Sequence, residues 1–384
     1  MKKFLILLMM AGVMYAQNAK KEITIVVEAH KLPENAKVYI SGNDALLGGW
    51  NPGTVQMDKV SDSIWSRKFS FDEKETIEFK FTLGSWDSEA MNADGSVPGN
   101  KYCTVAGDTT LKYVVAAWRN GERPVFGRVT GTVEYVRNMK GEGIDPRDVV
   151  IWLPPSYGRD KDKHYPVLYM HDGQNIVDPK TSSFGVDWGA DETADSLIKE
   201  GKMQEIIIVG INNTKDRTAE YSYTDKGRSY MSFITETLKP FIDKNYRTLP
   251  DRDNTATMGS SMGGLISMML AWEHTDVFSK AACLSPAFRI GELNYLPYIS
   301  GFRGKKPVSI YIDNGGLGLE SRLQPGVEEM VSLLKEKGYE EGRDLLVYFE
   351  PGAEHNEIAW AKRLYKPMLF LFGVPGAQSS RTLK

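Results

Sequence analysis

The chain has 384 residues, of which 41% are hydrophobic and 25% are charged, an ordinary globular composition. This length favours roughly two or three domains over one. The 47 Lys and Arg residues nearly balance the 50 Asp and Glu residues, so the formal charge is only −3. Because phosphate backbones and anionic membranes are bound by concentrated basic patches, the composition does not indicate nucleic-acid or membrane-surface binding.

The first residues have the pattern of a secretory signal peptide. Lys2 and Lys3 form a basic start, residues 4–13 are an apolar run, and Ala16 stands at a plausible cleavage point. The apolar run is too short to span a bilayer, and no Cys follows it that could carry a lipid. We therefore expect residues 1–16 to be removed, no membrane span to remain, and the mature protein to be periplasmic or secreted.

Residues 21–116 contain short alternating segments separated by Gly, Asn, Asp and Pro, which is typical of strands and turns. The clearest strand patterns are residues 23–27, 37–40, 64–69 and 77–81. No segment here has a convincing helical period. The sequence therefore predicts a small all-β, immunoglobulin-like sandwich in this part of the chain.

A connecting stretch, residues 117–145, comes next, and its alternating part from Val129 to Val136 predicts an antiparallel edge strand. From residue 146 to residue 374, near-continuous apolar strands alternate with amphipathic helices. That pattern predicts an α/β domain with a mostly parallel sheet covered on both faces. The strand patterns are residues 149–153, 166–170, 206–211, 255–258, 280–284, 308–312 and 345–349, and the helical patterns are 229–245, 264–273, 326–337 and 357–371. Residues 375–384 form a C-terminal tail.

The two cysteines, Cys103 and Cys283, fall in different predicted domains and do not make a disulfide framework. Cys283 lies in an apolar segment and is expected to be a buried small side chain. No Cys and His residues have zinc-ligand spacing, so we predict neither a structural metal nor a cofactor.

Residues 259–263 read G-S-S-M-G and place Ser261 at the centre of a G-x-S-x-G motif, after a short strand and directly before a helix. This is the context that a nucleophilic serine of the α/β-hydrolase fold requires. The glycines permit a sharp turn from strand to helix, and the turn directs the N–H groups of the helix start toward developing negative charge. Ser260 is expected to be needed only for packing.

A serine nucleophile needs a base, and His355 is the best candidate among the five histidines. It follows the last predicted strand and precedes the last helix, where this fold delivers its histidine. Two residues remain candidates for the acid of the triad. Asp313 stands at the end of the penultimate strand, and Glu320 lies farther into the loop that follows it. Either one could orient the imidazole and stabilise the imidazolium formed during attack.

The turn after an early central strand, residues 170–175, is expected to complete an oxyanion hole. The backbone N–H of Gly173 or Gln174 would act together with that of Met262. His171 and Asp172 in this turn are interpreted as structural residues that brace it. Arg217 either lines the cleft and contacts substrate or forms an ion pair with Glu220.

Taken together, these motifs resemble the putative-esterase family related to esterase D. That family includes feruloyl and acetyl-xylan esterases of the first carbohydrate-esterase family, siderophore esterases and mycolyl transferases. The resemblance covers residues 146–374 and rests on residues 169–175, 259–264, 313–320 and 354–355. It implies ester hydrolysis through an acyl-enzyme. The family usually places its acid a few residues beyond the glycine of the 313–320 loop, which favours Glu320, although the loop is longer than usual here.

The N-terminal part resembles starch-binding or glycogen-binding carbohydrate modules. The matching segments are residues 38–43, 48–52 and 78–81. Such modules stack exposed aromatic rings on sugar faces, and Trp86 is the candidate here, whereas Trp50 and Trp65 are expected to belong to the framework. The Trp-Glu tract that carries a main starch site in these modules is not evident after Phe81. The alternative is a structural domain that shapes the esterase cleft.

We therefore expect an exported serine esterase that removes feruloyl or acetyl groups from a polysaccharide or oligosaccharide ester. Xylan is the polysaccharide we expect first among the candidates. Two alternatives stay open. One is an esterase of siderophore trilactones, although the loss of Lys2 and Lys3 on export would leave a more acidic chain, ill suited to an anionic ferric complex. The other is a glycan-binding protein whose esterase domain has lost its activity.

Overall fold

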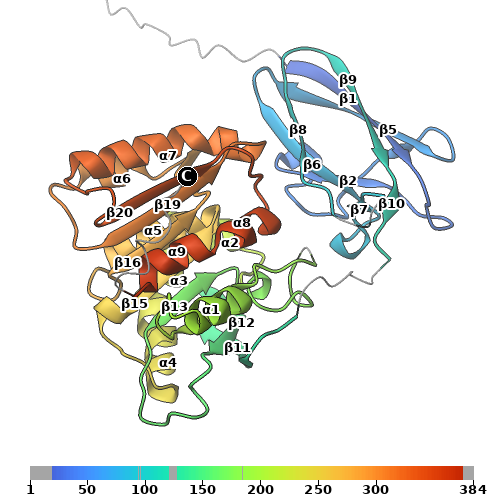
Figure 1. Ribbon diagram of the computed structural model, residues 1–384. Coiled ribbons are helices and arrows are strands. Elements are labelled where there is room, and N and C mark those ends of the chain that lie inside the picture. The colour runs from blue at the N-terminus through green and yellow to red at the C-terminus, as the bar shows by residue number, and fades with distance from the viewer. Residues whose placement is uncertain (1–19, 94, 96, 121–127, 184, 375–384) are drawn as a thin grey trace, which may run out of the picture. The chain divides into compact units, whose positions relative to one another are not determined.

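The computed structural model describes residues 20–93, 95, 97–120, 128–183 and 185–374 (Figure 1). The expected signal peptide, residues 1–16, and the expected tail, residues 375–384, lie outside the described residues. The chain divides into two compact units, Met1–Pro124 and Val125–Lys384. None of the helices in the described part of the chain is both long and apolar enough to cross a membrane.

The first unit is a β-sandwich, as the alternating pattern predicted. Its two four-stranded sheets have the orders β4-β5-β1-β9 and β3-β2-β6-β8. Alternate side chains of β1, Ile23, Ile25 and Val27, point into a core that also contains Phe79 and Phe81 of β6. The elements are β1 (Lys20–Ala29), β2 (Tyr39–Gly42), η1 (Ala45–Leu47), β3 (Val55–Gln56), β4 (Asp58–Lys59), β5 (Ile64–Asp72), β6 (Thr76–Thr82), η2 (Trp86–Ser88), β7 (Ala90–Met91), β8 (Lys101–Thr104), β9 (Thr109–Val115) and β10 (Ala117–Trp118).

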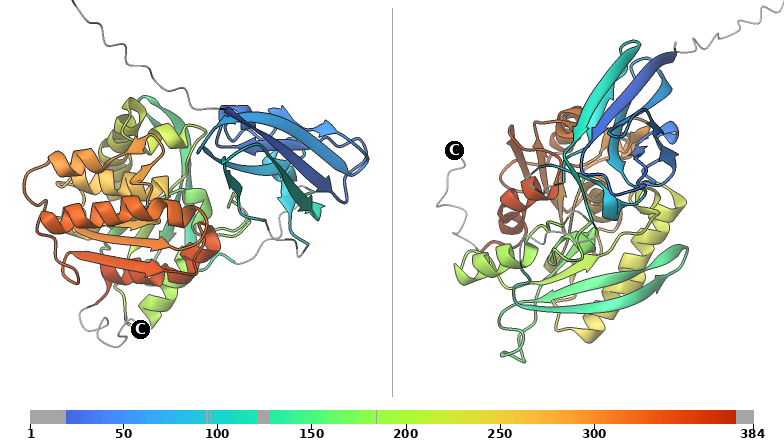
Figure 2. Two further views of the ribbon diagram at one scale, coloured as in Figure 1. Left: turned by 90° about the horizontal axis from the view of Figure 1, so that it is seen from above. Right: turned by 90° about the vertical axis from the view of Figure 1, so that its right-hand side faces the viewer.

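The second unit is built on an eight-stranded sheet of order β11-β12-β14-β13-β15-β16-β19-β20. The strands from β14 to β20 are parallel, whereas β11 and β12 pair antiparallel and form a long ribbon at one edge (Figure 2). The edge strand predicted near residues 129–136 is therefore β11. The strands are β11 (Thr132–Gly141), β12 (Ile144–Leu153), β13 (Val167–His171), β14 (Ile207–Ile211), β15 (Thr255–Ser260), β16 (Lys280–Leu284), β19 (Ser309–Gly315) and β20 (Leu345–Glu350), with a small hairpin of β17 (Arg289–Ile290) and β18 (Leu293–Asn294).

Helices cover both faces of this sheet, as expected for near-continuous apolar strands. On one face the strands pack against α3, α4, α5, α6 and α7, and on the other face against α1, α8 and α9. The helical elements are η3 (Gly173–Asn175), α1 (Ala190–Lys199), α2 (Arg217–Glu220), α3 (Asp225–Ser232), η4 (Phe233–Leu238), α4 (Lys239–Asn245), η5 (Arg252–Asn254), α5 (Met262–Glu273), α6 (Leu296–Gly301), α7 (Leu319–Glu336), α8 (Glu357–Arg363) and α9 (Tyr365–Phe372).

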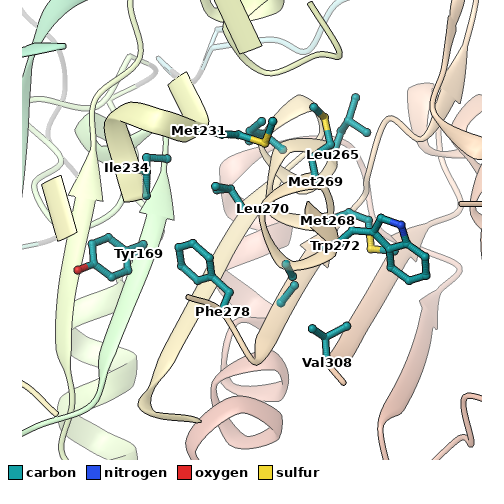
Figure 3. Close-up of a cluster of buried hydrophobic side chains, with 14 of the residues drawn as sticks. Tyr169, Met231, Ile234, Leu265, Met268, Met269, Leu270, Trp272, Phe278 and Val308 are labelled. Carbon is teal, nitrogen blue, oxygen red and sulfur yellow. The ribbon is translucent and has the colours of Figure 1, made fainter. Parts of the chain in front are cut away.

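Helix α5 lies at the centre of one of these layers. Its side chains from Leu265 to Trp272 are buried around the whole helix, as expected of a helix that is apolar on every side. Figure 3 shows them between Met231 and Ile234 on one side and Phe278 and Val308 on another. This packing fixes the helix whose first turn follows Ser261.

Two of the predicted helices that bear on the site differ from the structure. Helix α7 begins at Leu319, well before residue 326, because the chain accommodates Pro325 inside the helix. Glu320 therefore lies in the first turn of a helix, not in a loop, and its side chain is buried. The single helix predicted over residues 357–371 is two helices, α8 and α9, that meet at Leu364.

Candidate active site

The turn from β15 to α5 holds Ser261 in a strained backbone conformation. Ser261 has φ 57° and ψ −120°, and α5 begins at the next residue. A non-glycine residue in such a region costs about 1–3 kcal/mol and persists only where its surroundings enforce it. Here the N–H of Ser261 donates to the carbonyl of Leu284 at 2.9 Å, and its own carbonyl accepts from the N–H of Ala287 at 3.0 Å. The segment after β16 thus holds the turn in place.

Gly259, two residues before Ser261, is required by the close approach of other backbone atoms. A Cβ on Gly259 would lie 2.6 Å from the carbonyl carbon of Gly263, which is too close for any side chain. A Cβ on Gly263 would come within 3.4 Å of the side chains of His171 and Asp172. The serine turn therefore lies directly against the turn that follows β13.

His355 and Glu320 lie side by side. His355 is in the loop between β20 and α8, and its Nδ1 is 3.4 Å from Oε1 of Glu320. Nδ1 has no hydrogen-bond partner of good geometry in the part of the chain that the structure describes. Hydrogen bonds of this kind are often long without substrate and shorten in the complex. The side chains of His355 and Glu320 are 14% and 0% exposed, so the pair is well shielded from water.

The environment of Glu320 favours its ionised form. Burial acts to raise the pKa of Glu320, but His355, the hydroxyl of Ser285 and the N–H of Gly315 outweigh it and lower this pKa below the ordinary value. The Ser285 hydroxyl donates to Oε1 at 2.5 Å, and the Gly315 N–H donates to Oε2 at 3.1 Å. Glu320 is therefore a carboxylate that faces an imidazole at neutral pH.

Asp313, the other candidate acid, is paired with Arg363. The Nε of Arg363 lies 3.0 Å from Oδ2 of Asp313, and its Nη2 donates to Oδ1 at 3.1 Å. The hydroxyl of Tyr311 donates to Oδ2 at 3.0 Å, and the N–H of Ser285 donates to Oδ1 at 3.2 Å. Asp313 and Arg363 are both buried. The nearest basic side chain therefore differs between the two carboxylates: it is Arg363 for Asp313 and His355 for Glu320.

Ser285 connects these groups, and sequence reasoning did not single it out. Besides donating to Glu320, its hydroxyl accepts from Nε1 of Trp360 at 2.9 Å and from Nη2 of Arg363 at 2.8 Å. The ring of Trp360 meets the His355 ring edge to face, with centroids 5.0 Å apart. The position of Ser285 directly after β16, between the strands that lead to Ser261 and Asp313, was a usable signal. Trp360 and Arg363, on an amphipathic helix, gave no such signal.

The turn after β13 leads into the start of a short helix. Asp172 has φ 57°, and the short helix η3 begins at Gly173. A Cβ on Gly173 would lie 2.4 Å from the carbonyl carbon of Gly210 in β14, so only glycine fits. The first N–H groups of a helix have no acceptor within that helix. This applies to Gly173 and Gln174 in η3 and to Met262 at the positive end of the α5 dipole.

Arg217 braces this turn through Asp172. Its Nε and Nη2 donate to Oδ1 and Oδ2 of Asp172, each at 2.7 Å, and Nδ2 of Asn213 donates to Oδ1 at 2.6 Å. The expected alternative pairing of Arg217 with Glu220 is wrong, because Glu220 points inward and binds Arg147 at 2.7 and 3.0 Å. The Arg217 side chain is 29% exposed, so it also reaches solvent.

His171 is a neutral structural residue. Its Nδ1 lies 2.9 Å from the hydroxyl of Tyr230, and its Nε2 lies 3.1 Å from Oγ1 of Thr257. Complete burial lowers the pKa of His171 to about 3. An imidazole that is neutral and hydrogen-bonded at both nitrogens serves to hold the turn, in agreement with the bracing role expected for it.

In the first unit, Trp86 is half-exposed and begins η2. Its ring lies 6.5 Å from that of Trp50, with an angle of 38° between the planes. Trp65 is buried in the sandwich core, as expected, but Trp50, which has a positive φ of 63°, is only partly buried. Trp50 and Trp86 are therefore two neighbouring aromatic rings that are both partly exposed.

Comparison with known families covers both units. Residues 144–365 match the family model described as a putative esterase, and residues 20–109 match the model of a starch binding domain.

Two curated relatives match the esterase part. The uncharacterized protein YbbA of Bacillus subtilis (strain 168) is 24% identical over 245 residues, which are 59% of this chain and 93% of YbbA. The endo-1,4-beta-xylanase/feruloyl esterase of Xylanibacter ruminicola is 27% identical over 229 residues, which are 58% of this chain. That match spans only 29% of the relative's length.

Solved structures share the fold. A ferulic acid esterase superposes with a TM-score of 0.54 at 23% identity, covering 63% of this chain and 98% of its own. The enterobactin esterase FES from Shigella flexneri superposes with a TM-score of 0.53 at 12% identity, covering 93% of this chain and 94% of its own. These likenesses, together with the strand order, identify the second unit as an α/β-hydrolase fold preceded by a β-sandwich.

Proposed function

The chain belongs to the putative-esterase family, and we propose that it is a serine esterase in which Ser261 attacks the ester carbonyl. Nε2 of His355 takes the proton from the Ser261 hydroxyl and later returns it to the leaving alcohol. Glu320 keeps the proton of the imidazole on Nδ1 and stabilises the imidazolium. Water then hydrolyses the acyl-enzyme by the same route.

The main support is the continuity between the strained turn and the His355–Glu320 pair. Two consecutive residues connect them: the carbonyl of Leu284 accepts from the N–H of Ser261, and the hydroxyl of Ser285 donates to Glu320. Ser261 and Glu320 are thus both joined to the end of β16, and His355 is joined to it through Glu320. Asp313 is the weaker choice for the acid, since its oxygens are held by Arg363.

The oxyanion formed during attack would be held by backbone N–H groups. We assign the N–H of Met262 to one side and that of Gly173 or Gln174 to the other. The contact of the serine turn with the turn after β13 supports this assignment, since a Cβ on Gly263 would touch His171 and Asp172. Such preorganised donors stabilise developing charge without rearranging during the reaction.

We further propose that the substrate is a polysaccharide or oligosaccharide ester. Feruloyl and acetyl esters of xylan are the preferred candidates. Two observations support this choice: the N-terminal domain of the starch-binding type, and the relative named as an endo-1,4-beta-xylanase/feruloyl esterase. Trp86, together with Trp50, would stack on a sugar ring, and the exposed part of Arg217 would contact substrate. Export through the expected signal peptide would bring the enzyme to this substrate.

Hydrolysis of methyl ferulate and 4-nitrophenyl acetate by the full chain tests the proposal. Ser261→Ala should lower kcat/KM by about 10³-fold or more on whichever ester is turned over. Ser260→Ala is the matched control, because Ser260 is the neighbouring buried serine and should keep most of the activity. A fluorophosphonate probe should label the wild type and not Ser261→Ala. Near-full hydrolysis by Ser261→Ala would exclude the mechanism.

One second candidate has a specific observation in its favour. The fold likeness to the enterobactin esterase spans both units of this chain, whereas that to the ferulic acid esterase covers 63% of it. An esterase of siderophore trilactones would turn over a ferric catecholate trilactone faster than feruloylated arabinose. The reverse preference would favour the carbohydrate ester. Absence of fluorophosphonate labelling in the wild type would instead favour an inactive glycan-binding protein.

A further inference from the structure

Three carboxylates gather at the start of α1, apart from the residues assigned to catalysis. Asp187 precedes the helix, and Asp191 and Glu192 lie in its first turn. One oxygen from each of the three residues lies within 4.8 Å of the other two. Two oxygens that bind one calcium ion at about 2.3–2.6 Å cannot be more than about 5 Å apart, so this spacing fits a shared cation.

The cluster is buried and lacks partners for some of its oxygens. Asp187 is 7% exposed and Asp191 is 0% exposed. Oδ2 of Asp191 accepts from the N–H of Thr130 at 2.5 Å, but its Oδ1 is buried without a hydrogen bond among the described residues, as is Oε2 of Glu192. A native protein leaves few buried polar atoms unpaired, and each one calls for an explanation such as a bound ion.

The charge of the cluster is also unbalanced. No ion pair joins Asp187, Asp191 or Glu192 to a Lys or Arg within the described part of the chain. Carboxylates this close in a buried site need either shared protons or a cation to be stable.

We propose that Asp187, Asp191 and Glu192 bind a divalent cation with a preference for oxygen ligands, calcium before magnesium. The ligands are carboxylates only, and hard cations of this class prefer such oxygens. Three carboxylates leave the remaining coordination positions to water. Such a site would be a structural metal site built from carboxylates alone. The spacing of the cysteines and histidines had predicted no metal.

The position of the site indicates what the cation would do. The N–H of Trp188 donates to the carbonyl of Asn175 at 2.9 Å, which ties the cluster to the end of η3. The ring of Trp188 also packs on Trp360, with centroids 5.5 Å apart, and Trp360 contacts His355. A cation here would therefore hold both the turn with Gly173 and the loop with His355.

Calcium binding can be measured on the full chain without reference to activity. After removal of metals with EDTA and then of the chelator, terbium should show luminescence sensitised by Trp188, which lies beside its ligands, and calcium should quench it by competition. Calcium at a hundredfold excess over its Kd should raise Tm by roughly 5–10 °C. Ser261→Ala should respond in the same way, so the result is separate from the esterase mechanism.

Variants locate the binding. Asp191→Asn and Glu192→Gln should each abolish the sensitised luminescence and the calcium shift in Tm. Asp225→Asn, which removes an exposed carboxylate at the start of α3, should keep both. If Asp191→Asn does not fold, the half-buried Glu192→Gln decides. The proposal is overturned if the wild type shows no terbium signal and no shift with calcium or magnesium, or if Glu192→Gln responds like the wild type.

Discussion

Two matched substitutions separate the carboxylates that compete for the role of triad acid. Glu320→Gln and Asp313→Asn each replace a buried carboxylate by an amide of the same size. Glu320 faces His355 at 3.4 Å, whereas Asp313 holds Arg363 at 3.0 Å. We expect the first variant to lose turnover with a small change in stability, and the second to lose stability with a small change in turnover.

The size of the turnover effect comes from the hydrogen bonds of Glu320. Its two oxygens accept from Ser285 and from the N–H of Gly315, so the oxygen of a glutamine can serve only one of these donors well. If it keeps Gly315, the amide NH₂ faces His355 and selects the tautomer with an unprotonated Nδ1. That tautomer carries its proton on Nε2 and cannot accept the proton of Ser261. The loss of the correct tautomer in serine triads costs on the order of 10⁴ in kcat.

The size of the stability effect comes from Arg363. Asparagine at position 313 would leave a buried guanidinium with only Glu320, at 3.9 Å, as an anionic neighbour. Removing one partner of a buried ion pair costs about 3–5 kcal/mol. For a domain of this size that corresponds to a fall in Tm of roughly 10 °C.

The readouts are thermal unfolding and ester hydrolysis, both at pH 7.5. Hydrolysis is measured well below the Tm of each variant. Glu320→Gln should lower kcat/KM by at least about 10³-fold with its Tm nearly unchanged. Asp313→Asn should lose less than about tenfold in kcat/KM once corrected for folded protein. The assignment would be refuted by near-wild-type turnover of Glu320→Gln together with a collapse of turnover in a stable Asp313→Asn.

Two further outcomes follow from the turn after β13. Gly173→Ala places a methyl group 2.4 Å from the backbone of Gly210, so it should lower the unfolding free energy by about 1–3 kcal/mol or more and also lower turnover. Gly158→Ala, which has open space around it, is the control and should change neither quantity. Equal stability of the two variants would contradict the crowding at Gly173. His171 has a folded pKa of about 3 against an ordinary value of 6.5, so its contribution to stability is fully present above pH 6.5 and is lost as the pH falls toward 3. Urea unfolding of the wild type should therefore show a loss of about 2 kcal/mol in unfolding free energy between pH 7.5 and pH 5. The loss should be smaller in His171→Gln. Equal losses in the two proteins would be evidence against a buried neutral imidazole.

Much of this protein could be predicted from short stretches of sequence. The alternation of residues 23–27, the apolar strands before Ser261 and the glycines around it predicted the β-sandwich, the parallel sheet and the turn from strand to helix. These features depend on side-chain periodicity and on local backbone sterics, which act over a few residues. The placement of His355 between the last strand and α8 belongs to the same class, because it is a matter of order along the chain.

The tertiary structure alone decided which charged groups meet. Asp313 lies in β19 and Glu320 follows that strand closely. They are distinguished by distant partners: Arg363, 50 residues beyond Asp313, and His355 beside Glu320. Arg217 binds Asp172, 45 residues earlier, although Glu220 lies on its own short helix. A buried charge is stable only beside a partner, and that partner is set by how distant elements pack, which no local pattern encodes. Burial likewise turned Asp187, Asp191 and Glu192, unremarked in the sequence, into a cluster that calls for a cation.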